Sequence, residues 1–231
     1  MSYPTFTFLK LKKNYGLIQR ETCLFDSESI LPTAPSARLE EDMQEGKAVP
    51  LMTSKAKSEA IIYPIIKEIK RKNPLITIFS AYSLNIEGDR DLNGNPDFMI
   101  SALPQKTAPE APIFCLVESK NGLIEEGYAQ CAAEMYAAHL FNQENNFPHS
   151  TIYGAVTNAY DWVFLRLESN VIYIDTERYF LNDLARILGI FQFIINERST
   201  AEVAAHSIFK LRPAHTGFTF KLLISYNENL H

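Results

Sequence analysis

The sequence has little of what marks several large classes of protein. Its 231 residues include three cysteines, an odd number whose spacing is not that of a metal-binding cluster. No apolar run is long enough to span a membrane, and no long apolar segment stands near the N-terminus. We therefore expect neither a disulfide framework nor a membrane partner, and we expect a reducing, cytoplasmic location.

Several catalytic signatures are also missing. The chain has no phosphate-binding P-loop, no dinucleotide fingerprint, no HExxH zinc motif, no GxSxG motif and no Cys/His nucleophile pair. If the protein takes part in an ATP-driven process, the ATPase must therefore be a partner chain.

Positive charge is in short supply as well. The formal net charge is −5, which is not the strongly basic balance of a non-specific nucleic-acid binder, although a local basic patch can suffice. Hydrophobic residues make up 46% of the chain and aromatic residues 12%. This composition is enough for the core of one domain with extensions.

One stretch combines an apolar run with charged residues at its end. Residues 113–117 are continuously apolar, which predicts a short strand buried on both faces. Polarity then changes at Glu118, Ser119 and Lys120. Because side chains alternate along a strand, Glu118 and Lys120 should point to the same side. These charges either mark where the strand reaches solvent or hold a cation and a water molecule.

A second carboxylate is expected near this strand end. Asp97 follows Pro96 at the start of a predicted strand, 98–102, and the proline-containing segment 103–112 is predicted to be a loop. If the two strands pair, Asp97 lies near Glu118. Two converging carboxylates are costly unless one is protonated or a cation neutralises them. Oxygen ligands of this kind suit Mg²⁺ or Mn²⁺.

These residues resemble the signature of a known superfamily. Pro96-Asp97 followed by Glu118-Ser119-Lys120 resembles the PD-(D/E)xK motif of the restriction-endonuclease-like nucleases. Glu59 lies on a predicted upstream helix. Gln130, on a predicted downstream helix, resembles the glutamine that many members place after the ExK strand. Members of the RecB-like branch carry Tyr four residues after that glutamine, where this chain has Glu134.

The resemblance implies an α/β fold with a restriction-endonuclease-like core, in which helices flank a central mixed sheet in the order α-β-β-β-α-β. It covers about residues 54–167. We expect residues 54–198 to form this core, residues 1–53 an N-terminal extension packed on it, and residues 199–231 a C-terminal tail, in a single domain overall. The segments VESKNG, AQCAAEMYAA and IYGAVTN also resemble those of a group of bacterial proteins, a likeness that implies no substrate.

The resemblance further implies metal-dependent hydrolysis of phosphodiester bonds in nucleic acid. The metal, Mg²⁺ or Mn²⁺, would be bound by oxygen atoms of Glu59, Asp97, Glu118 and the Ser119 backbone. Lys120 would orient or help deprotonate the attacking water and face the phosphate. Gln130 would help to position the water or the backbone. The implied catalytic residues are Asp97, Glu118, Lys120 and Gln130.

The most cationic part of the chain is the predicted helix at 54–72, which ends in a cluster of Lys67, Lys70, Arg71 and Lys72. This cluster is either a solvated helix face or a strip that contacts a nucleic-acid backbone. The second interpretation makes nucleic acid the partner, with DNA expected in preference to RNA. A further predicted helix, 184–197, is apolar nearly all round and is either well buried or part of a homodimer interface.

Two other classes of function are compatible with the sequence. One is a non-catalytic nuclease-fold module in a protein or nucleic-acid complex, which the negative net charge and Glu134 both allow, and which would work with a specificity protein. The other is a structural α/β domain in which Asp97 and Glu118 merely end strands. The complete Asp, Glu and Lys set argues against the structural domain, because converging carboxylates are costly without a cation to share.

Overall fold

The computed structural model of the protein describes residues 3–26, 28, 30–86, 91–104, 106–147 and 151–210, with side chains up to residue 198. The chain divides into two compact units, Met1–Asn196 and Glu197–His231. The first unit contains the sheet and every candidate site residue. In the second unit, the residues up to Lys210 are helical.

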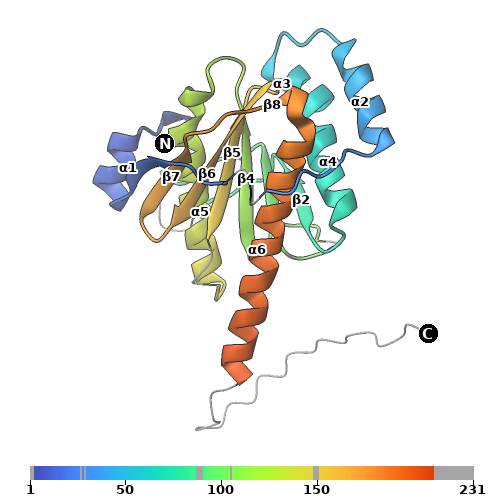
Figure 1. Cartoon of the computed structure of the whole chain (residues 1–231). Coiled ribbons are helices and arrows are strands. Elements are labelled where there is room, and N and C mark those ends of the chain that lie inside the picture. The colour runs from blue at the N-terminus through green and yellow to red at the C-terminus, as the bar shows by residue number, and fades with distance from the viewer. Residues whose placement is uncertain are drawn as a thin grey trace, which may run out of the picture. The chain divides into compact units, whose positions relative to one another are not determined.

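A mixed eight-stranded sheet forms the centre of the first unit (Figure 1). Its strands are β1 (Ile18–Thr22), β2 (Thr77–Ser80), β3 (Phe98–Ser101), β4 (Ile113–Ser119), β5 (Ile152–Thr157), β6 (Asp161–Glu168), β7 (Val171–Asp175) and β8 (Tyr179–Phe180). Their order across the sheet is β1-β7-β6-β5-β4-β3-β2, and β8 pairs with β6. The pairs β1–β7 and β4–β5 are parallel, and the other pairs are antiparallel.

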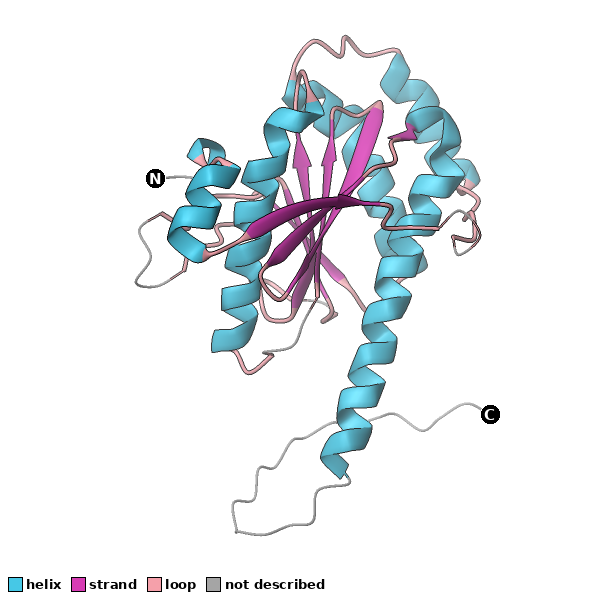
Figure 2. Ribbon diagram, turned by 60° about the vertical axis from the view of Figure 1, so that its left-hand side comes forward, coloured by secondary structure: helices cyan, strands magenta, loops and turns pink. Residues whose placement is uncertain are grey.

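Helices cover both faces of this sheet (Figure 2). They are α1 (Phe8–Tyr15), α2 (Ala37–Lys47), α3 (Ser54–Lys57), α4 (Tyr63–Lys72), α5 (Tyr128–Glu144) and α6 (Leu184–Lys210). Short 3₁₀ turns, η1 (Tyr3–Thr5), η3 (Ile124–Gly127) and η4 (Leu181–Asp183), and a π-helical turn, η2 (Ser58–Ile62), connect to them. One core contains α2, α4 and α6, and the other contains α1 and α5.

Alternation along the strands explains the two cores. Phe98 and Ile100 pack in the core of α4 and α6, whereas Met99 between them packs in the core of α5. Strand β4 is buried from Ile113 to Glu118, as the continuous apolar run predicted. The sheet is thus shielded on both faces in its middle, and its polar residues gather where strands end.

The strand order differs from that of the expected core. The expected core, α-β-β-β-α-β, has one strand after the second helix, although the sequence also predicts a hairpin of 151–157 with 162–167 and a further strand at 171–174. Here β5 is followed by β6 and β7 in antiparallel hairpin pairs, because the turns between them are short.

The N-terminal segment, 1–53, was expected to be only a packed extension, but it also supplies an edge strand, since β1 pairs with β7. The apolar helix predicted at 184–197 forms within α6, which continues to Lys210. Residues 211–231 of the expected tail lie outside the described residues.

The helix predicted at 54–72 is divided into three pieces. Thr53 caps α3 by accepting a hydrogen bond from the Ala56 amide at 3.1 Å. The wider turn η2 follows, and α4 then begins at Tyr63 with Pro64 in its first turn, where a missing N–H costs nothing. Glu59 therefore lies on the π-helical turn rather than on a regular α-helix.

Candidate functional site

The C-terminal end of β4 places Glu118 and Lys120 on the same side of the sheet, as alternation predicted. The Lys120 Nζ lies 2.9 Å from Glu118 Oε1, and Glu118 is only 5% exposed. The Lys120 backbone amide donates to the Thr157 carbonyl at 2.7 Å, which extends the pairing with β5 past the end of β4. Both charged groups are therefore fixed by the sheet rather than by a loop.

Asp97 stands beside this pair, directly before β3. Because Phe98 faces Val117 in an antiparallel pair, Asp97 is level with Glu118. Its Oδ2 accepts hydrogen bonds from the Ser119 amide at 2.7 Å and the Ser119 Oγ at 2.6 Å. The sequence had not assigned this role to the Ser119 side chain, which ties the two strands together at the site.

The loop that leads to Asp97 is held by the N-terminal segment. The Tyr3 hydroxyl donates to the Leu84 carbonyl, and the Tyr3 ring lies so close to Gly94 that an added Cβ would come within 2.7 Å of it. Gly94 also has a φ of +151°, which disfavours other residues. A packing role was expected for residues 1–53, and no pattern in the sequence pointed to Tyr3 as the contact.

Helix α5, which packs on β4, contributes the side chains of Gln130 and Glu134 to the site. The Gln130 Oε1 accepts from Lys120 Nζ at 2.6 Å. The Gln130 Nε2 donates to Glu118 Oε1 at 2.7 Å and to Glu134 Oε1 at 2.9 Å. Gln130, which the family resemblance had singled out, therefore lies at the site and contacts both Glu118 and Lys120. Glu134 joins the same network, and the sequence had treated it only as a departure from a pattern.

The two glutamates of this network hold their protons unusually tightly. Burial raises the pKa of Glu118 to about 7, with the charge of Asp97 adding to the increase and Lys120 opposing it. Burial raises the pKa of Glu134 well above its ordinary value, and the charge of Glu118 raises it further. Since Lys120 contacts Glu118 directly, we take Glu134 to be the neutral member of the pair. Raised pKa values at a strand end are typical of functional sites.

Lys120 is held along its stem as well as at its amine. Gly127, at the end of η3, leaves room for it, because an added Cβ would lie 2.9 Å from Lys120 Cε and 3.1 Å from Lys120 Cγ. The side chain of Val156 would lie closer still, at 2.6 Å. Glycine here allows the helix start to approach the lysine closely.

Asp97 Oδ1 accepts no hydrogen bond from the residues that the structure describes, and Glu118, which bonds to Lys120, Gln130 and Glu134, lies level with it. The hard oxygen atoms of these two carboxylates, with the Ser119 carbonyl nearby, could bind a divalent cation. Glu59 is in a different setting, because its side chain is 70% exposed and lies 3.8 Å from Lys55. Within the described parts of the chain, no three His, Cys, Asp or Glu side chains are grouped closely enough to bind a metal.

The basic residues of α4 are largely engaged with partners in the protein. Arg71 lies 2.6 Å and Lys72 3.5 Å from the buried Glu68. The Lys70 amine donates to the carbonyls of Pro74, at 2.7 Å, and Ile76. Lys67 has the longest ion pair, 4.0 Å from Asp42. Lys67 is therefore the member of this strip with the most freedom to meet a ligand.

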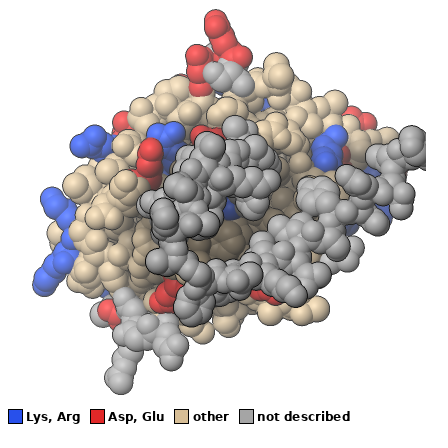
Figure 3. All heavy atoms as spheres, turned by 90° about the horizontal axis from the view of Figure 1, so that it is seen from below, with Lys and Arg blue, Asp and Glu red and all other residues tan. Residues whose placement is uncertain are grey.

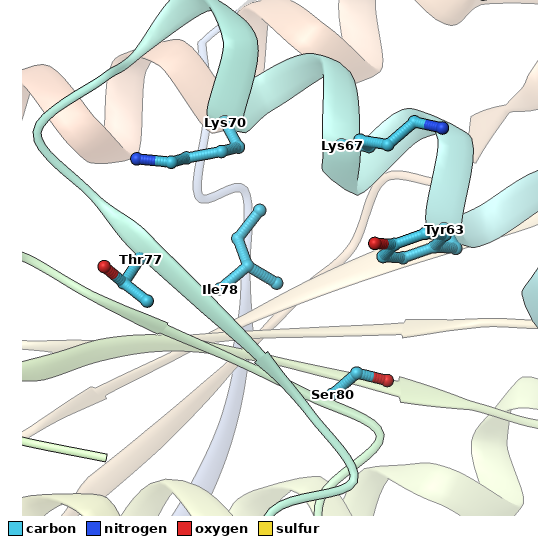
Figure 4. Close-up of a pocket in the computed structure, with 6 residues that line it drawn as sticks. All are labelled: Tyr63, Lys67, Lys70, Thr77, Ile78 and Ser80. Carbon is cyan, nitrogen blue, oxygen red and sulfur yellow. The ribbon is translucent and has the colours of Figure 1, made fainter. Parts of the chain in front are cut away.

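Lys67 also borders a cavity of about 250 Å³ between α4 and β2 (Figure 4). The cavity is lined by Tyr63, Lys67, Lys70, Thr77, Ile78 and Ser80. The Lys67 amine lies 5.6 Å from the Tyr63 ring centroid, and that ring stacks on Phe98 with centroids 6.1 Å apart. The cavity therefore lies on the α4 face of the sheet, where Phe98 packs, whereas alternation places Asp97 on the opposite face.

Charges elsewhere are more evenly mixed. On the face seen from below, the visible basic and acidic side chains are scattered among uncharged ones (Figure 3). None of the described helices is long and apolar enough to cross a membrane.

Comparison with known proteins adds no family, because neither the protein-family models nor the curated proteins gave a match to this sequence. The residues at the end of β4 must therefore carry the functional argument.

Proposed function

We propose that the protein is a metal-dependent phosphodiesterase that hydrolyses nucleic acid, with a site of PD-(D/E)xK type at the end of β4. The observation that carries this proposal is the convergence of Asp97 on the Glu118–Lys120 pair, where the charge of Asp97 and burial raise the pKa of Glu118 to about 7. Like charges of this kind are costly in the absence of a cation.

The residues present suit Mg²⁺ or Mn²⁺, since both prefer oxygen ligands and Mg²⁺ commonly takes only one or two carboxylates. Asp97, Glu118 and the Ser119 carbonyl would hold the ion, and Glu59 would need to turn towards it from an exposed position. When bound, such an ion lowers the pKa of water and offsets charge on the phosphate.

In this proposal Lys120 contacts the attacking water and the scissile phosphate. Its ammonium has three N–H donors, of which two are engaged by Glu118 and Gln130, so one can be directed to a water or a phosphate oxygen. Hydrolysis joins the water oxygen to phosphorus and breaks one P–O ester bond. The water gives up a proton to solvent, and the departing alkoxide takes one from solvent. Lys120 orients that water, and Gln130 keeps the amine in place.

The alternative function, a non-catalytic binding module, is favoured by one observation. The cations of α4 are mostly engaged with Glu68, Asp42 and backbone carbonyls, so few are left for a phosphate backbone. A protein of this kind would bind a partner without cleaving nucleic acid, and a specificity protein or an ATPase would then supply the activity.

The test combines metal calorimetry with a cleavage panel on the full chain. The wild type should bind Mn²⁺ and cleave at least one of single- or double-stranded DNA or RNA in Mg²⁺ or Mn²⁺. Asp97→Ala and Glu118→Ala should remain folded and lose both properties. Glu110→Ala, which removes an exposed carboxylate paired with Lys106, is the control and should lose neither. Mn²⁺ binding without cleavage of any substrate supports the binding module, and absence of Mn²⁺ binding contradicts both the site and the enzyme.

A further inference from the structure

Glu134 is a buried carboxyl to which the proposed chemistry gives no role. It lies on α5, is 0% exposed, and forms hydrogen bonds with Gln130 and Glu118. Burying a carboxyl group costs free energy even when hydrogen bonds offset part of that cost. An apolar side chain of the same size would avoid this cost, so the carboxyl calls for a specific explanation.

The explanation begins with the orientation of the Gln130 amide. Its two ends meet groups of opposite character, because a carboxylate only accepts hydrogen bonds and an ammonium only donates them. With Nε2 towards Glu118 and Glu134, Oε1 faces Lys120 at 2.6 Å. A flipped amide would set its NH₂ against the ammonium and its carbonyl against the Glu118 carboxylate.

Each N–H of this amide has an acceptor of its own. One is directed to Glu118 Oε1, which also accepts from Lys120, and the other to Glu134 Oε1. Residues 130 and 134 are one turn apart on α5, so the second contact is made within a rigid helix. Glu134 can therefore hold the amide even when Glu118 is engaged elsewhere.

We propose that Glu134 is a positioning residue, whose carboxyl fixes the Gln130 amide so that the amide carbonyl holds the Lys120 amine at the end of β4. This inference rests on the proposed function for the part that concerns the reaction. The contact between Glu134 and Gln130 can be tested without it.

The first measurement uses the wild-type full chain. In an NMR spectrum of ¹⁵N-labelled protein, the Gln130 side-chain amide is identified by its loss in Gln130→Met. Its two protons should give separate signals and exchange with water at least about tenfold more slowly than those of the exposed Gln44. Exchange as fast as that of Gln44 overturns the proposal without any Glu134 variant.

The second measurement compares two substitutions of similar size. Glu134→Gln keeps an oxygen that can accept from Gln130, and Glu134→Met removes it. In Glu134→Met, one Gln130 amide proton should lose its protection and kcat should fall by about 10–100-fold, with KM and Mn²⁺ affinity within about twofold of the wild type. Glu134→Gln should retain the protected signals and most of kcat. Unchanged Gln130 signals in Glu134→Met would show that Glu134 does not hold the amide.

A matched control lies on the same helix. Asn142 is also 0% exposed, and its amide bonds to both backbone groups of Ile113 at 2.7 and 2.8 Å. Asn142→Leu should lower stability while the Gln130 signals and kcat stay as in the wild type. A loss of kcat in Asn142→Leu equal to that in Glu134→Met would mean that any buried polar change on α5 has this effect, and would overturn the positioning role.

The outcomes separate this inference from the proposed function. If the wild type cleaves no substrate but Glu134→Met still releases the Gln130 amide, the phosphodiesterase fails and the contact stands. If cleavage is found and kcat is the same in Glu134→Met, the phosphodiesterase stands and Glu134 has no part in it.

Discussion

Glu68 on α4 and Glu118 on β4 are both buried glutamates beside basic side chains, yet their surroundings differ. Glu68 is 1% exposed and accepts from the Ser36 amide at 3.0 Å, the Ser36 Oγ at 2.9 Å and Arg71 at 2.6 Å. Burial raises its pKa, but the Ser36 hydrogen bonds and the charges of Arg71 and Lys72 together outweigh burial, so the pKa is lowered overall. Since Ser36 also caps α2, Glu68 joins α2 to α4.

Glu118 has fewer donors and more negative neighbours. It accepts from Lys120 and Gln130, while Asp97 lies beside it, and its pKa is raised to about 7. A carboxylate that is fully stabilised by hydrogen bonds and positive charges contributes to the fold. A carboxylate that is repelled by a neighbouring carboxylate can instead be stabilised by binding a cation. The difference between the two glutamates therefore separates a structural ion pair from a candidate site.

The largest expected effect is on cleavage, and it contrasts the lysines of the two clusters. Lys120→Met keeps most of the aliphatic stem and removes the amine, so kcat should fall by about 10²-fold or more while Mn²⁺ binding persists. Lys72→Met makes the same change beside Glu68, which keeps its bonds to Ser36 and Arg71, so kcat at saturating substrate should not change. Equal cleavage by wild type and Lys120→Met would point to a contaminating nuclease or another site.

The next effect is on stability, and here the substitution at Glu68 should have the larger effect and the substitution at Glu118 the smaller one. Glu68→Ala leaves the partly buried Ser36 amide without its acceptor and Arg71 without its carboxylate, and should lower the free energy of unfolding by about 1–3 kcal/mol. Glu118→Ala removes a carboxylate that is repelled by Asp97, so its loss should be smaller despite the vacated space. Urea unfolding of both variants gives the comparison. A larger loss in Glu118→Ala would mean that Glu118 is the structural residue.

Part of the difference between Glu68 and Glu118 could be predicted from the sequence. The apolar run before Glu118 and the alternation that puts Glu118 and Lys120 on one side could be predicted, because they depend on local periodicity. Gln130 was singled out only by the family resemblance. The α/β class followed from the same patterns. Local patterns do not determine which strands pair at long range, so the pairing of the edge strand β1 with β7 was not predicted.

Long-range partners account for the other omissions. Ser36 and Glu68 are 32 positions apart, and Tyr3 and Leu84 are 81 apart, so only the fold brings them together. The engagement of Lys70, Arg71 and Lys72 with acceptors in the protein was hidden for the same reason. Glu134 was visible as a departure from a pattern, but its burial and its bond to Gln130 required the packing of α5 on β4.

The dependence of stability on pH should also distinguish the two glutamates. Raising the Glu118 pKa from 4.5 to about 7 makes the folded state bind a proton that the unfolded state has released. The free energy of unfolding should therefore fall as pH rises through this interval, by up to about 1.4 kcal/mol per pH unit. Glu68 has a lowered pKa, so its contribution is instead lost as pH falls in the acid range.

Urea unfolding between pH 5 and 8 checks this sign. Glu118→Gln should flatten the decline. The difference from the wild type separates Glu118, with the neighbouring Glu134 whose pKa it raises, from His139, whose pKa is lowered by burial. Mn²⁺ should have a similar effect in the wild type, because a cation favours the ionised carboxylate. A decline as steep in Glu118→Gln as in the wild type would assign the pH dependence to other groups.

The smallest effect concerns the cations around Glu68 and whether they are available to nucleic acid. Arg71 and Lys72 face Glu68, and Lys70 is bound to backbone carbonyls, whereas Lys67 has only a 4.0 Å pair with Asp42 and borders the cavity beside Tyr63. Lys67→Gln should thus reduce the salt dependence of nucleic-acid binding by about 0.7–0.9 in the log–log slope, the value of one phosphate contact. Lys72→Gln should leave the slope as it is, because its amine is committed to Glu68. Anisotropy titrations of labelled single- and double-stranded DNA at several salt concentrations give the slopes. If both substitutions reduce the slope equally, Lys72 leaves Glu68 for phosphate, and the cluster around Glu68 contributes to binding as well as to the fold.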